Sequence, residues 1–266
     1  MRLEGKTAVV IGAGQSPGEG MGNGRATALR FTQEGAKVMA VDRDLRSAEK
    51  TASMVKQSGG ECVAFEADVT KERTLIAAIA AAEQRWGRID ILHYNVGVSI
   101  AGGDAPLLSF TEAAFDRISA INLRGAIMAC KHVVPIMRRQ RAGAITMISS
   151  LAALENYPFV AYKTTKAALI AFAKQVAIQN AEFGIRANVI LPGLIDTPMA
   201  VDTRARVSGK SRAEVAAERD ARVPLRRKMG TAWDVANAAL FLASEEANFI
   251  TGVALLVDGG GALNVG

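Results

Sequence analysis

Short runs of β-branched and other apolar residues alternate with longer amphipathic runs along the whole chain. Most of the short runs are apolar at every position, as expected of strands that are buried on both faces between layers of helices. Strands are predicted at residues 7–11, 37–41, 62–66, 89–94, 144–148, 186–191 and 253–257. Helices are predicted near residues 22–34, 44–58, 71–86, 112–138, 160–183 and 231–243.

This alternation of strands with helical crossovers predicts an α/β fold, a doubly wound parallel sheet of seven strands. The 266 residues suffice for one large core, and no linker-like segment divides them, so we expect a single domain. Ligands of such sheets bind beyond the carboxyl ends of the strands, where the strand order reverses. The segment that follows the first strand is therefore the first candidate for a binding site.

Composition and charge narrow the classes of function. The formal charge of +6 and the isoelectric point near 9.5 raise nucleic acid as a partner. However, the basic clusters at residues 137–143 and 225–230 are not interleaved with aromatic side chains, which make up 5% of the chain. We therefore expect no nucleic-acid binding, and a positive surface that favours anionic cofactors and substrates.

The chain carries no pattern typical of export, membrane insertion or metal binding. Its first apolar run is too short for a signal-peptide core, and no stretch approaches the roughly 18 apolar residues of a membrane span. Cys62 and Cys130 are expected to be reduced, packed thiols, and neither histidine has a partner at ligand spacing. We expect a cytoplasmic protein with no metal site and no membrane partner.

A glycine-rich stretch follows the first predicted strand and leads into the first predicted helix. This stretch, GAGQSPGEGMGNGRA at residues 12–26, contains six glycines. A helix N-terminus in this place offers free N–H groups to a pyrophosphate. Asp42 ends the second strand, eighteen positions after Gly24, near the spacing of about 20 typical of a carboxylate that binds the adenosine ribose.

These features resemble the short-chain dehydrogenase/reductase family, whose fingerprint is Thr-Gly-x-x-x-Gly-x-Gly, then Arg-Ala and, eleven positions after the last glycine, Gly-Ala. Gly12, Gly22 and Gly24 match the three fingerprint glycines, and Gly35 lies eleven positions after Gly24. Ten positions separate Gly12 from Gly22 where the family usually has four, so six residues are inserted. We expect the insert to enlarge the loop beside the phosphates, which Asn23 also borders.

The resemblance implies a Rossmann-type dinucleotide-binding half over residues 6–97. Asp42 would accept hydrogen bonds from both ribose hydroxyls and repel a 2′-phosphate, which implies NAD in preference to NADP even though Arg43 follows. Tyr94 and His93 are interpreted as packing residues. Further contacts with the cofactor are implied for Asp68, Val69, Asn95, Gly97, Ile195 and Thr197.

Tyr162 and Lys166 are four positions apart and share one face of a predicted helix. The resemblance implies that Tyr162 is the general acid/base, and that Lys166 and the positive nicotinamide ring lower its pKa from about 10. Lys166 would also hold the nicotinamide ribose. Ser150 best matches the family's serine that polarises the substrate oxygen. Strand alternation points Ser149 and Ser150 to opposite faces, so only one of them can serve. Asn122 is implied to hold a water molecule in the proton relay.

The resemblance further implies a catalytic half over residues 98–261, in which residues 199–223 cover the substrate. The implied reaction is hydride transfer between nicotinamide and a secondary alcohol or ketone, in a homotetramer or homodimer that packs through the 112–138 and 160–183 helices. A sugar, a cyclic alcohol, a steroid and a β-hydroxyacyl thioester all stay open as substrates, the last making the protein a 3-oxoacyl thioester reductase. The alternative of another class is a sensor or scaffold protein that binds the dinucleotide without turnover.

Overall fold

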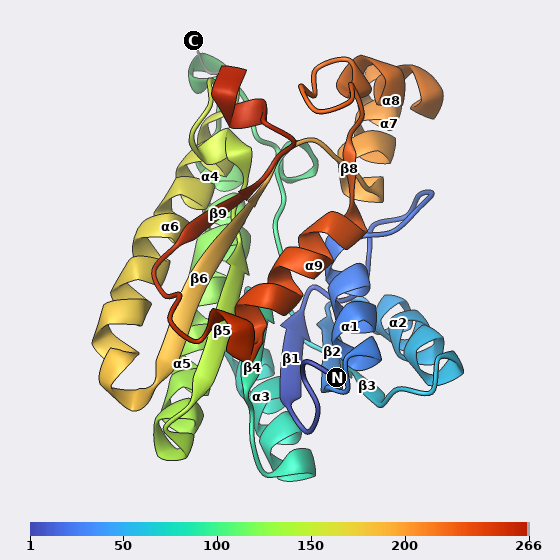
Figure 1. Cartoon of the computed structure of the whole chain (residues 1–266). Coiled ribbons are helices and arrows are strands. Elements are labelled where there is room, and N and C mark those ends of the chain that lie inside the picture. Colours follow the sequence, from blue (N-terminus) through green and yellow to red (C-terminus); the bar gives the residue numbers. More distant parts are fainter. Residues whose placement is uncertain (265–266) are drawn as a thin grey trace.

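The computed structural model describes residues 1–264, and its centre is a seven-stranded parallel sheet (Figure 1). The strand order is β3-β2-β1-β4-β5-β6-β9. The predicted strands are confirmed to within two residues at each end. Their bounds are β1 (Thr7–Ile11), β2 (Lys37–Asp42), β3 (Cys62–Glu66), β4 (Ile91–Tyr94), β5 (Gly143–Ile148), β6 (Ile185–Pro192) and β9 (Ala254–Val257).

Helices follow the strands as the amphipathic runs predict. They are α1 (Asn23–Gln33), α2 (Leu45–Gln57), α3 (Glu72–Trp86), α4 (Glu112–Ser119), α5 (Gly125–Gln140), α6 (Val160–Asn180) and α9 (Ala232–Ala243). The helix predicted near residues 112–138 contains a π-helical turn at Ala120–Arg124, which separates α4 from α5. Such wide turns inside helices often occur at functional sites.

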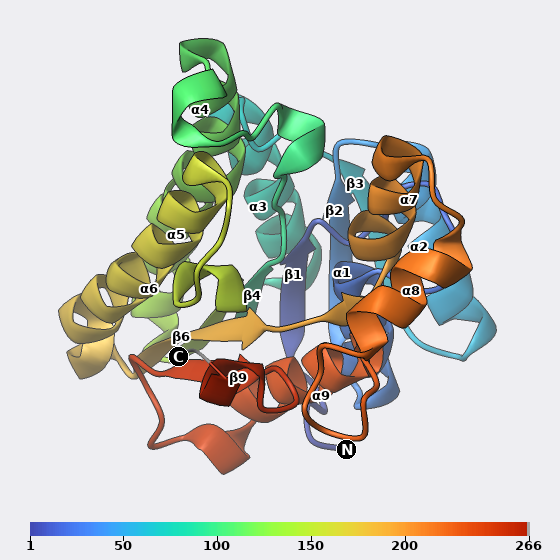
Figure 2. The same ribbon diagram turned by 90° about the horizontal axis from the view of Figure 1, so that it is seen from above.

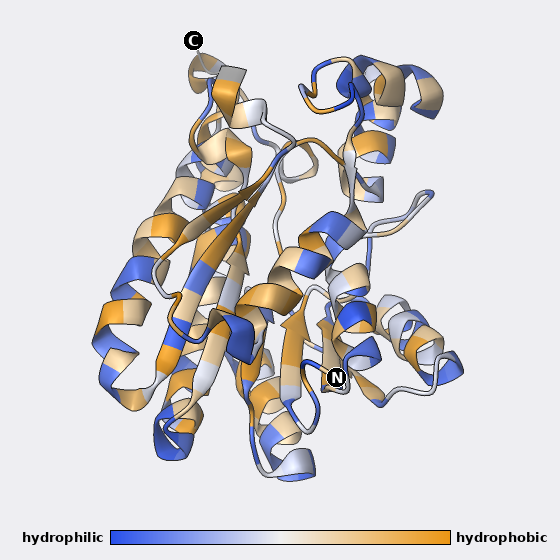
Figure 3. Ribbon diagram, in the orientation of Figure 1, coloured by the Kyte–Doolittle hydropathy of each residue, from blue (hydrophilic) through white to orange (hydrophobic). Residues whose placement is uncertain are grey.

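Helices cover both faces of the sheet, and each face has its own apolar core. Val9 and Ile11 of β1 pack in one core with side chains of α3, α5 and α6, whereas Ala8 and Val10 pack in the other with side chains of α1 and α9. All five residues of β1 are buried, which explains why the strand is apolar at every position. Figure 2 shows the two helical layers on either side of the sheet, and Figure 3 shows the apolar strands between them.

The strand order reverses between β1 and β4, which lie side by side at the middle of the sheet. The chain turns from β1 toward the edge at β3 and then returns to β4 on the other side. Ile11 pairs with Tyr94 in this register, so the loops that begin at Gly12 and Asn95 start next to each other. This is the position at which doubly wound sheets bind their ligands.

Residues 197–229, which we call the lid, lie beyond the carboxyl ends of the strands (Figure 1). Two short paired strands, β7 (Ile195–Asp196) and β8 (Gly230–Thr231), flank the lid. It contains a π-helical turn at Pro198–Asp202 and the helices α7 (Thr203–Ser208) and α8 (Arg212–Asp220). A small apolar cluster of its own holds the lid together, and the buried members of that cluster are Val201, Val215, Val223 and Met229.

Candidate active site

Tyr162 and Lys166 lie in the first turns of α6, and the chain reaches α6 from the end of β5 through Ser149 and Ser150. Burial raises the pKa of Tyr162 to about 12, and a hydrogen bond with the Ser150 hydroxyl acts in the opposite direction. The Ser149 hydroxyl is buried and donates to the carbonyl oxygen of Lys166 at 2.6 Å. The hydroxyl beside Tyr162 is therefore that of Ser150, whereas Ser149 holds the backbone of α6.

The Lys166 side chain is buried between two strand ends. Its Nζ donates to the carbonyl oxygens of Ile148 at 2.7 Å and of Val96 at 3.4 Å, and it lies 5.7 Å from the centre of the Tyr162 ring. A Cβ at Gly97 would lie only 2.8 Å from this Nζ, so the absence of a side chain at Gly97 admits the ammonium group. Burial lowers the pKa of Lys166 to about 7.

That Lys166 and the nicotinamide ring lower the pKa of Tyr162 stays a prediction. The groups that lower the pKa of Tyr162 against burial are the Ser150 hydroxyl and the guanidinium groups of Arg204 and Arg219 in the lid. Lys166 directs its ammonium group toward backbone carbonyls, and its own lowered pKa leaves it only partly charged near neutral pH. The guanidinium groups of the lid thus lie close enough to Tyr162 to favour its phenolate form.

Asn122 lies in the π-helical turn and is fully buried. Its Oδ1 accepts from the backbone N–H of Val98 at 2.8 Å, while its Nδ2 donates to the carbonyl oxygen of Val98 at 3.0 Å and to Thr165 Oγ1 at 3.1 Å. Asn122 thus ties the loop after β4 to α6, next to Lys166. Both Nδ2 hydrogens are engaged, so a water molecule held by this side chain would use the remaining lone pair of Oδ1.

Tyr94 of β4 contacts the backbone of the π-helical turn at Ala120–Arg124. Its hydroxyl donates to the carbonyl oxygen of Ile121 at 2.6 Å, and a Cβ at Gly125 would lie 2.4 Å from the same hydroxyl. The neighbouring His93 is buried, and its Nδ1 lies 2.7 Å from Thr146 Oγ1. Burial lowers the pKa of His93 to about 3, so its ring is neutral. Both residues pack inside the fold, and Tyr94 also supports the turn that carries Asn122.

Asp104 was missed by the sequence analysis and holds the start of α6. Its buried carboxylate accepts from the backbone N–H groups of Ala161 and Tyr162, both at 2.9 Å, and from Ser99 Oγ at 3.2 Å. Phe159 at the N-cap offers no side-chain acceptor, so Asp104 satisfies these first-turn donors from a distant loop. No local pattern reveals this role, because Asp104 is 58 positions from Tyr162.

Replacing Asp104 with Ala is expected to destabilise the fold and to weaken catalysis. Two buried N–H groups would lose their acceptor, at a cost of about 1–3 kcal/mol, or roughly 3 to 10 °C in Tm for a chain of this size. Asp104→Asn keeps one acceptor oxygen and should show a smaller effect. Thermal unfolding and kcat measured for both variants check this, and an Asp104→Ala protein with wild-type Tm and kcat would contradict it.

The glycine-rich loop after β1 is built on close backbone contacts. A Cβ at Gly24 would lie 1.9 Å from the carbonyl oxygen of Gly12, which itself has a φ of +83°. Asn95 Nδ2 donates to the carbonyl oxygen of Gly12 at 3.0 Å, and Thr51 Oγ1 donates to that of Ala13 at 2.8 Å. These two side chains steady the loop in a chain that has Ile11 where the family fingerprint has Thr.

The residues around this loop fit a dinucleotide. Helix α1 begins after Gly22 with no side-chain cap and no acidic residue in its first turn, and the buried Asn23 Oδ1 has no hydrogen-bond partner among the described residues. The free backbone N–H groups in the first turn of α1 would bind the pyrophosphate. Asp42 is half-buried at the end of β2, and its two oxygens accept from the N–H groups of Gly14 at 2.9 Å and Asp44 at 3.1 Å. Each oxygen keeps a lone pair with which it could bind a ribose hydroxyl.

The remaining predicted cofactor residues lie in loops that follow β3 and β7 and at the end of β7 itself. Asp68 Oδ1 accepts from the backbone N–H and the hydroxyl of Thr70 at 3.0 and 2.8 Å, and Val69 is buried. Ile195 is buried in β7, and Thr197 Oγ1 accepts from the N–H of Ala200 at 3.2 Å. All of these positions belong to the carboxyl-terminal side of the parallel strands.

The inserted loop contacts the lid. The backbone N–H of Glu19 donates to Asp202 Oδ1 at 3.0 Å, and Arg206 Nη1 donates to the carbonyl oxygen of Pro17 at 3.3 Å. A Cβ at Gly18 would lie 2.6 Å from Asp202 Cγ, so glycine permits this approach. The extra residues therefore extend the glycine-rich loop until it reaches the segment expected to cover the substrate.

Arg212 joins three carboxylates where the insert meets the lid. It lies 2.5 Å from Asp196 Oδ1, 3.4 Å from Asp202 Oδ2 and 3.9 Å from Glu19 Oε2. Asp196 ends β7, Asp202 lies in the lid and Glu19 belongs to the insert. A single side chain on α8 thus connects the insert, the lid and the strand that leads into Thr197.

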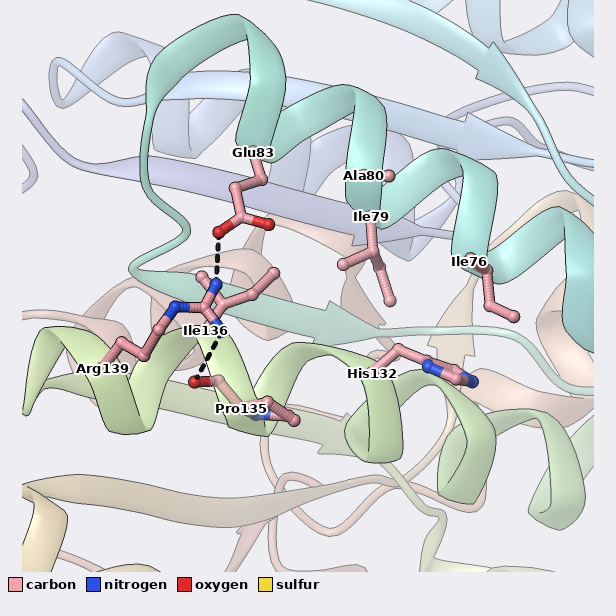
Figure 4. A pocket seen from close by; sticks show the side chains of 8 residues that line it. All are labelled: Ile76, Ile79, Ala80, Glu83, His132, Pro135, Ile136 and Arg139. Atoms are coloured by element: carbon pink, nitrogen blue, oxygen red, sulfur yellow. Dashed lines mark hydrogen bonds and ion pairs between the residues drawn. The ribbon is translucent and has the colours of Figure 1, made fainter.

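A separate hollow lies between α3 and α5, away from these residues (Figure 4). Apolar side chains form most of its wall, and Arg139 Nη2 lies 2.5 Å from Glu83 Oε1 at one end. None of the predicted site residues lines it. The eight lining residues are Ile76, Ile79, Ala80, Glu83, His132, Pro135, Ile136 and Arg139.

Comparison with known proteins assigns the chain to a family. The family described as enoyl-(acyl carrier protein) reductase matches residues 19–262. The structure of a Burkholderia xenovorans protein assigned to the short-chain dehydrogenases/reductases is 41% identical, covers 99% of this chain and 98% of its own, and has a TM-score of 0.89. The chain is a short-chain dehydrogenase/reductase. The family expected from the sequence is thereby confirmed.

Two further relatives of this short-chain dehydrogenase/reductase are named for the reactions they catalyse. A 2-(R)-hydroxypropyl-CoM dehydrogenase of Xanthobacter autotrophicus is 38% identical over 257 residues, which are 96% of this chain and 97% of the relative. The structure of levodione reductase is 30% identical, covers 99% of this chain and 100% of its own, and has a TM-score of 0.92. The protein is thus an oxidoreductase of a family that uses NAD(H) or NADP(H).

Neither a membrane-spanning element nor a metal centre is found in the part of the chain that the structure describes. Within residues 1–264, no helix is long and apolar enough to cross a membrane. The same residues contain no cluster of three histidine, cysteine or acidic side chains arranged to hold a metal ion.

Proposed function

We propose that this short-chain dehydrogenase/reductase transfers a hydride between NAD(H) and a secondary alcohol or ketone. The observation that carries the proposal is the hydroxyl of the half-buried Tyr162 beside the Ser150 hydroxyl, with the Lys166 side chain on the same face of α6. These three side chains lie on the carboxyl-terminal side of the sheet, as does the glycine-rich loop whose residues fit a dinucleotide. A proton donor therefore faces the region where the nicotinamide would lie, which favours turnover over a sensor or scaffold function.

The side chains divide the proton chemistry between them. The bound nicotinamide supplies the hydride to the carbonyl carbon, or takes it from the carbinol carbon in the reverse reaction. In reduction, the Ser150 hydroxyl donates a hydrogen bond to the substrate oxygen, and Tyr162 gives its proton to that oxygen as negative charge develops. In oxidation, Tyr162 takes the proton of the alcohol. One proton is consumed in reduction and one is released in oxidation.

Asp42 supports NAD as the cofactor in preference to NADP. Its carboxylate lies at the end of β2 beside Gly14, where an adenosine ribose would bind, and a 2′-phosphate there would be repelled. Arg43 points its charge into solvent, since the residue is exposed. The insert adds Glu19 and no cation, so it gives no attraction for an extra phosphate.

Assembly and location belong to the same proposal. We expect a homotetramer or homodimer that packs through α4, α5 and α6, a surface on which Phe115 is 47% and Ile178 is 73% exposed. We also expect the protein to act in the cytoplasm on a small-molecule alcohol or ketone.

The rate of alcohol oxidation is expected to rise with pH. Tyr162 must be a phenolate to accept the proton, and its pKa of about 12 means that the phenolate fraction grows by about tenfold per pH unit below that value. Ketone reduction needs the protonated phenol and should not rise over the same range. Initial rates of NADH formation and consumption between pH 6 and 10 test this. Oxidation that is independent of pH would contradict a proton-accepting role for Tyr162.

A further inference from the structure

The lid contains a buried arginine that has no acidic partner. Arg219 of α8 is only 7% exposed, and its Nε donates to the sulfur of Met229 at 3.3 Å. Within the described residues it makes no ion pair. Arginine is almost never buried unless an anion accompanies it, because removing its charge from water is costly. The position of Arg219 therefore indicates an anion that the chain itself does not supply.

The acidic side chains of the lid and its flanks are all used elsewhere. Asp196 and Asp202 pair with Arg212, and Asp220 Oδ2 lies 2.5 Å from Lys228 Nζ. Glu218 pairs with Lys210, and Glu214 closes the capping box of α8 with Ser211. Asp196 and Asp220 lie within electrostatic reach of Arg219, but each is paired with another cation and neither forms an ion pair with Arg219 among the described residues.

A second arginine, Arg204, lies near Arg219. Arg204 of α7 is half-buried, and its recorded hydrogen bond runs from Nη1 to the carbonyl oxygen of Ala200 at 2.9 Å. Arg204 and Arg219 are close enough to repel each other, since burial and then the charge of Arg204 lower the pKa of Arg219 to about 10. Two neighbouring guanidinium groups with no direct ion pair among the described residues are typical of an anion-binding site.

Both guanidinium groups lie within electrostatic reach of Tyr162. Their positive charges favour the phenolate form of Tyr162, and the hydroxyl of Tyr157 lies within electrostatic reach of Arg219. The Tyr157 ring is 5.6 Å from the Tyr162 ring, and its hydroxyl is 3.2 Å from Ser99 Oγ. The two arginines thus lie across the reacting centre from α6, on the segment that covers it.

We propose that Arg204 and Arg219 form a subsite for an oxyanion of the substrate. The substrate is then a ketone or secondary alcohol that carries a carboxylate, sulfonate or phosphate group on the side of the carbonyl carbon that faces the lid. This inference rests on the proposed function and narrows its substrate class.

Ketones that differ only in charge test the subsite. The probes are acetoacetate, acetonylsulfonate and acetonylphosphonate with the neutral methyl acetoacetate, together with 4-oxo and 5-oxo acids and their methyl esters. Wild-type kcat/KM with NADH is expected to be at least about tenfold higher for the best anion than for its ester. The ranking of the three anions shows which oxyanion the subsite takes.

Substitutions of Arg219 test whether this residue causes the preference for anionic ketones. Arg219→Met should lower kcat/KM for the preferred anion by about 10- to 100-fold and change that of the ester by less than about threefold. Arg219→Lys keeps the charge and should restore part of the loss. Arg226→Met removes an exposed charge of the same segment that does not act on Arg219, and it should leave both substrates unchanged. A merely structural Arg219 would lower both substrates equally, and the NADH dissociation constant reports any effect on the cofactor.

The outcomes separate this inference from the proposed function. Equal turnover of anions and esters, or equal losses in Arg219→Met, would overturn the anion subsite and leave the oxidoreductase intact. Where no probe is turned over, anions should still raise the Tm of the wild-type NADH complex but not that of Arg219→Met. The absence of that difference would also overturn the subsite. Failure to bind NADH or NADPH would instead contradict the proposed function.

Discussion

Replacing Tyr162 with Phe is expected to lower kcat/KM by about 10²- to 10⁴-fold in both directions of the reaction, because the general acid/base is removed. The ring itself stays, so its packing against Tyr157 should persist. Removal of a buried hydroxyl whose only described partner is Ser150 should cost little stability. Steady-state rates with NADH and the best ketone, together with the NADH dissociation constant, measure the two effects separately.

Tyr157→Phe is the matched control. It removes a hydroxyl from the neighbouring ring, where Ser99 is the described partner, and should reduce kcat only severalfold. Equal losses in the two variants would mean that the site merely tolerates polar change poorly. A Tyr162→Phe protein with more than about a tenth of wild-type kcat/KM would contradict the role of Tyr162 as the proton donor.

Replacing Asp42 with Ser is expected to reduce kcat/KM for NAD by about 10- to 100-fold and to improve the use of NADP. Hydrogen bonds to a charged carboxylate contribute about 1.5–3 kcal/mol, and the variant loses them while the repulsion of a 2′-phosphate disappears. The kcat/KM for NADH should fall while that for NADPH rises, so the ratio of the two should fall by more than the NADH value alone.

Asp42→Asn separates the two effects, since it keeps a side-chain acceptor for the N–H of Gly14 but removes the charge. NADPH use should improve in this variant while NADH use falls less than in Asp42→Ser. A wild-type protein that already prefers NADPH would mean that Arg43 or the insert outweighs Asp42. An unchanged cofactor ratio in both variants would place the ribose elsewhere.

The sheet could be predicted in detail because its central strands are buried on both faces. That burial requires apolar residues at every position, as in β1, and the polar segments between such strands mark the helices and loops. The register of the glycine loop could also be predicted, since the spacing from Gly24 to Gly35 is independent of the insert. The capping box of Ser211 and Glu214 was a readable sign of α8, although α7 and α8 were not predicted.

Features that depend on distant contacts could not be predicted. Asp104 binds the first turn of α6 across the fold, and the π-helical turn depends on the hydroxyl of Tyr94 from a neighbouring strand. The positive charges near Tyr162 come from Arg204 and Arg219, which are remote in sequence. Arginines of a mixed-charge segment look like solvated surface residues until the fold shows which one is buried.

The transfer of deuterium from the cofactor tests hydride transfer most directly. The protein would be incubated with NADH deuterated at C4 of the nicotinamide and with the ketone panel above, and the alcohols analysed by mass spectrometry. We predict deuterium on the carbinol carbon of at least one product, with none in the Tyr162→Phe protein over the same period. Protein that binds NADH and yet leaves all deuterium on the nicotinamide across the panel would contradict the proposed function.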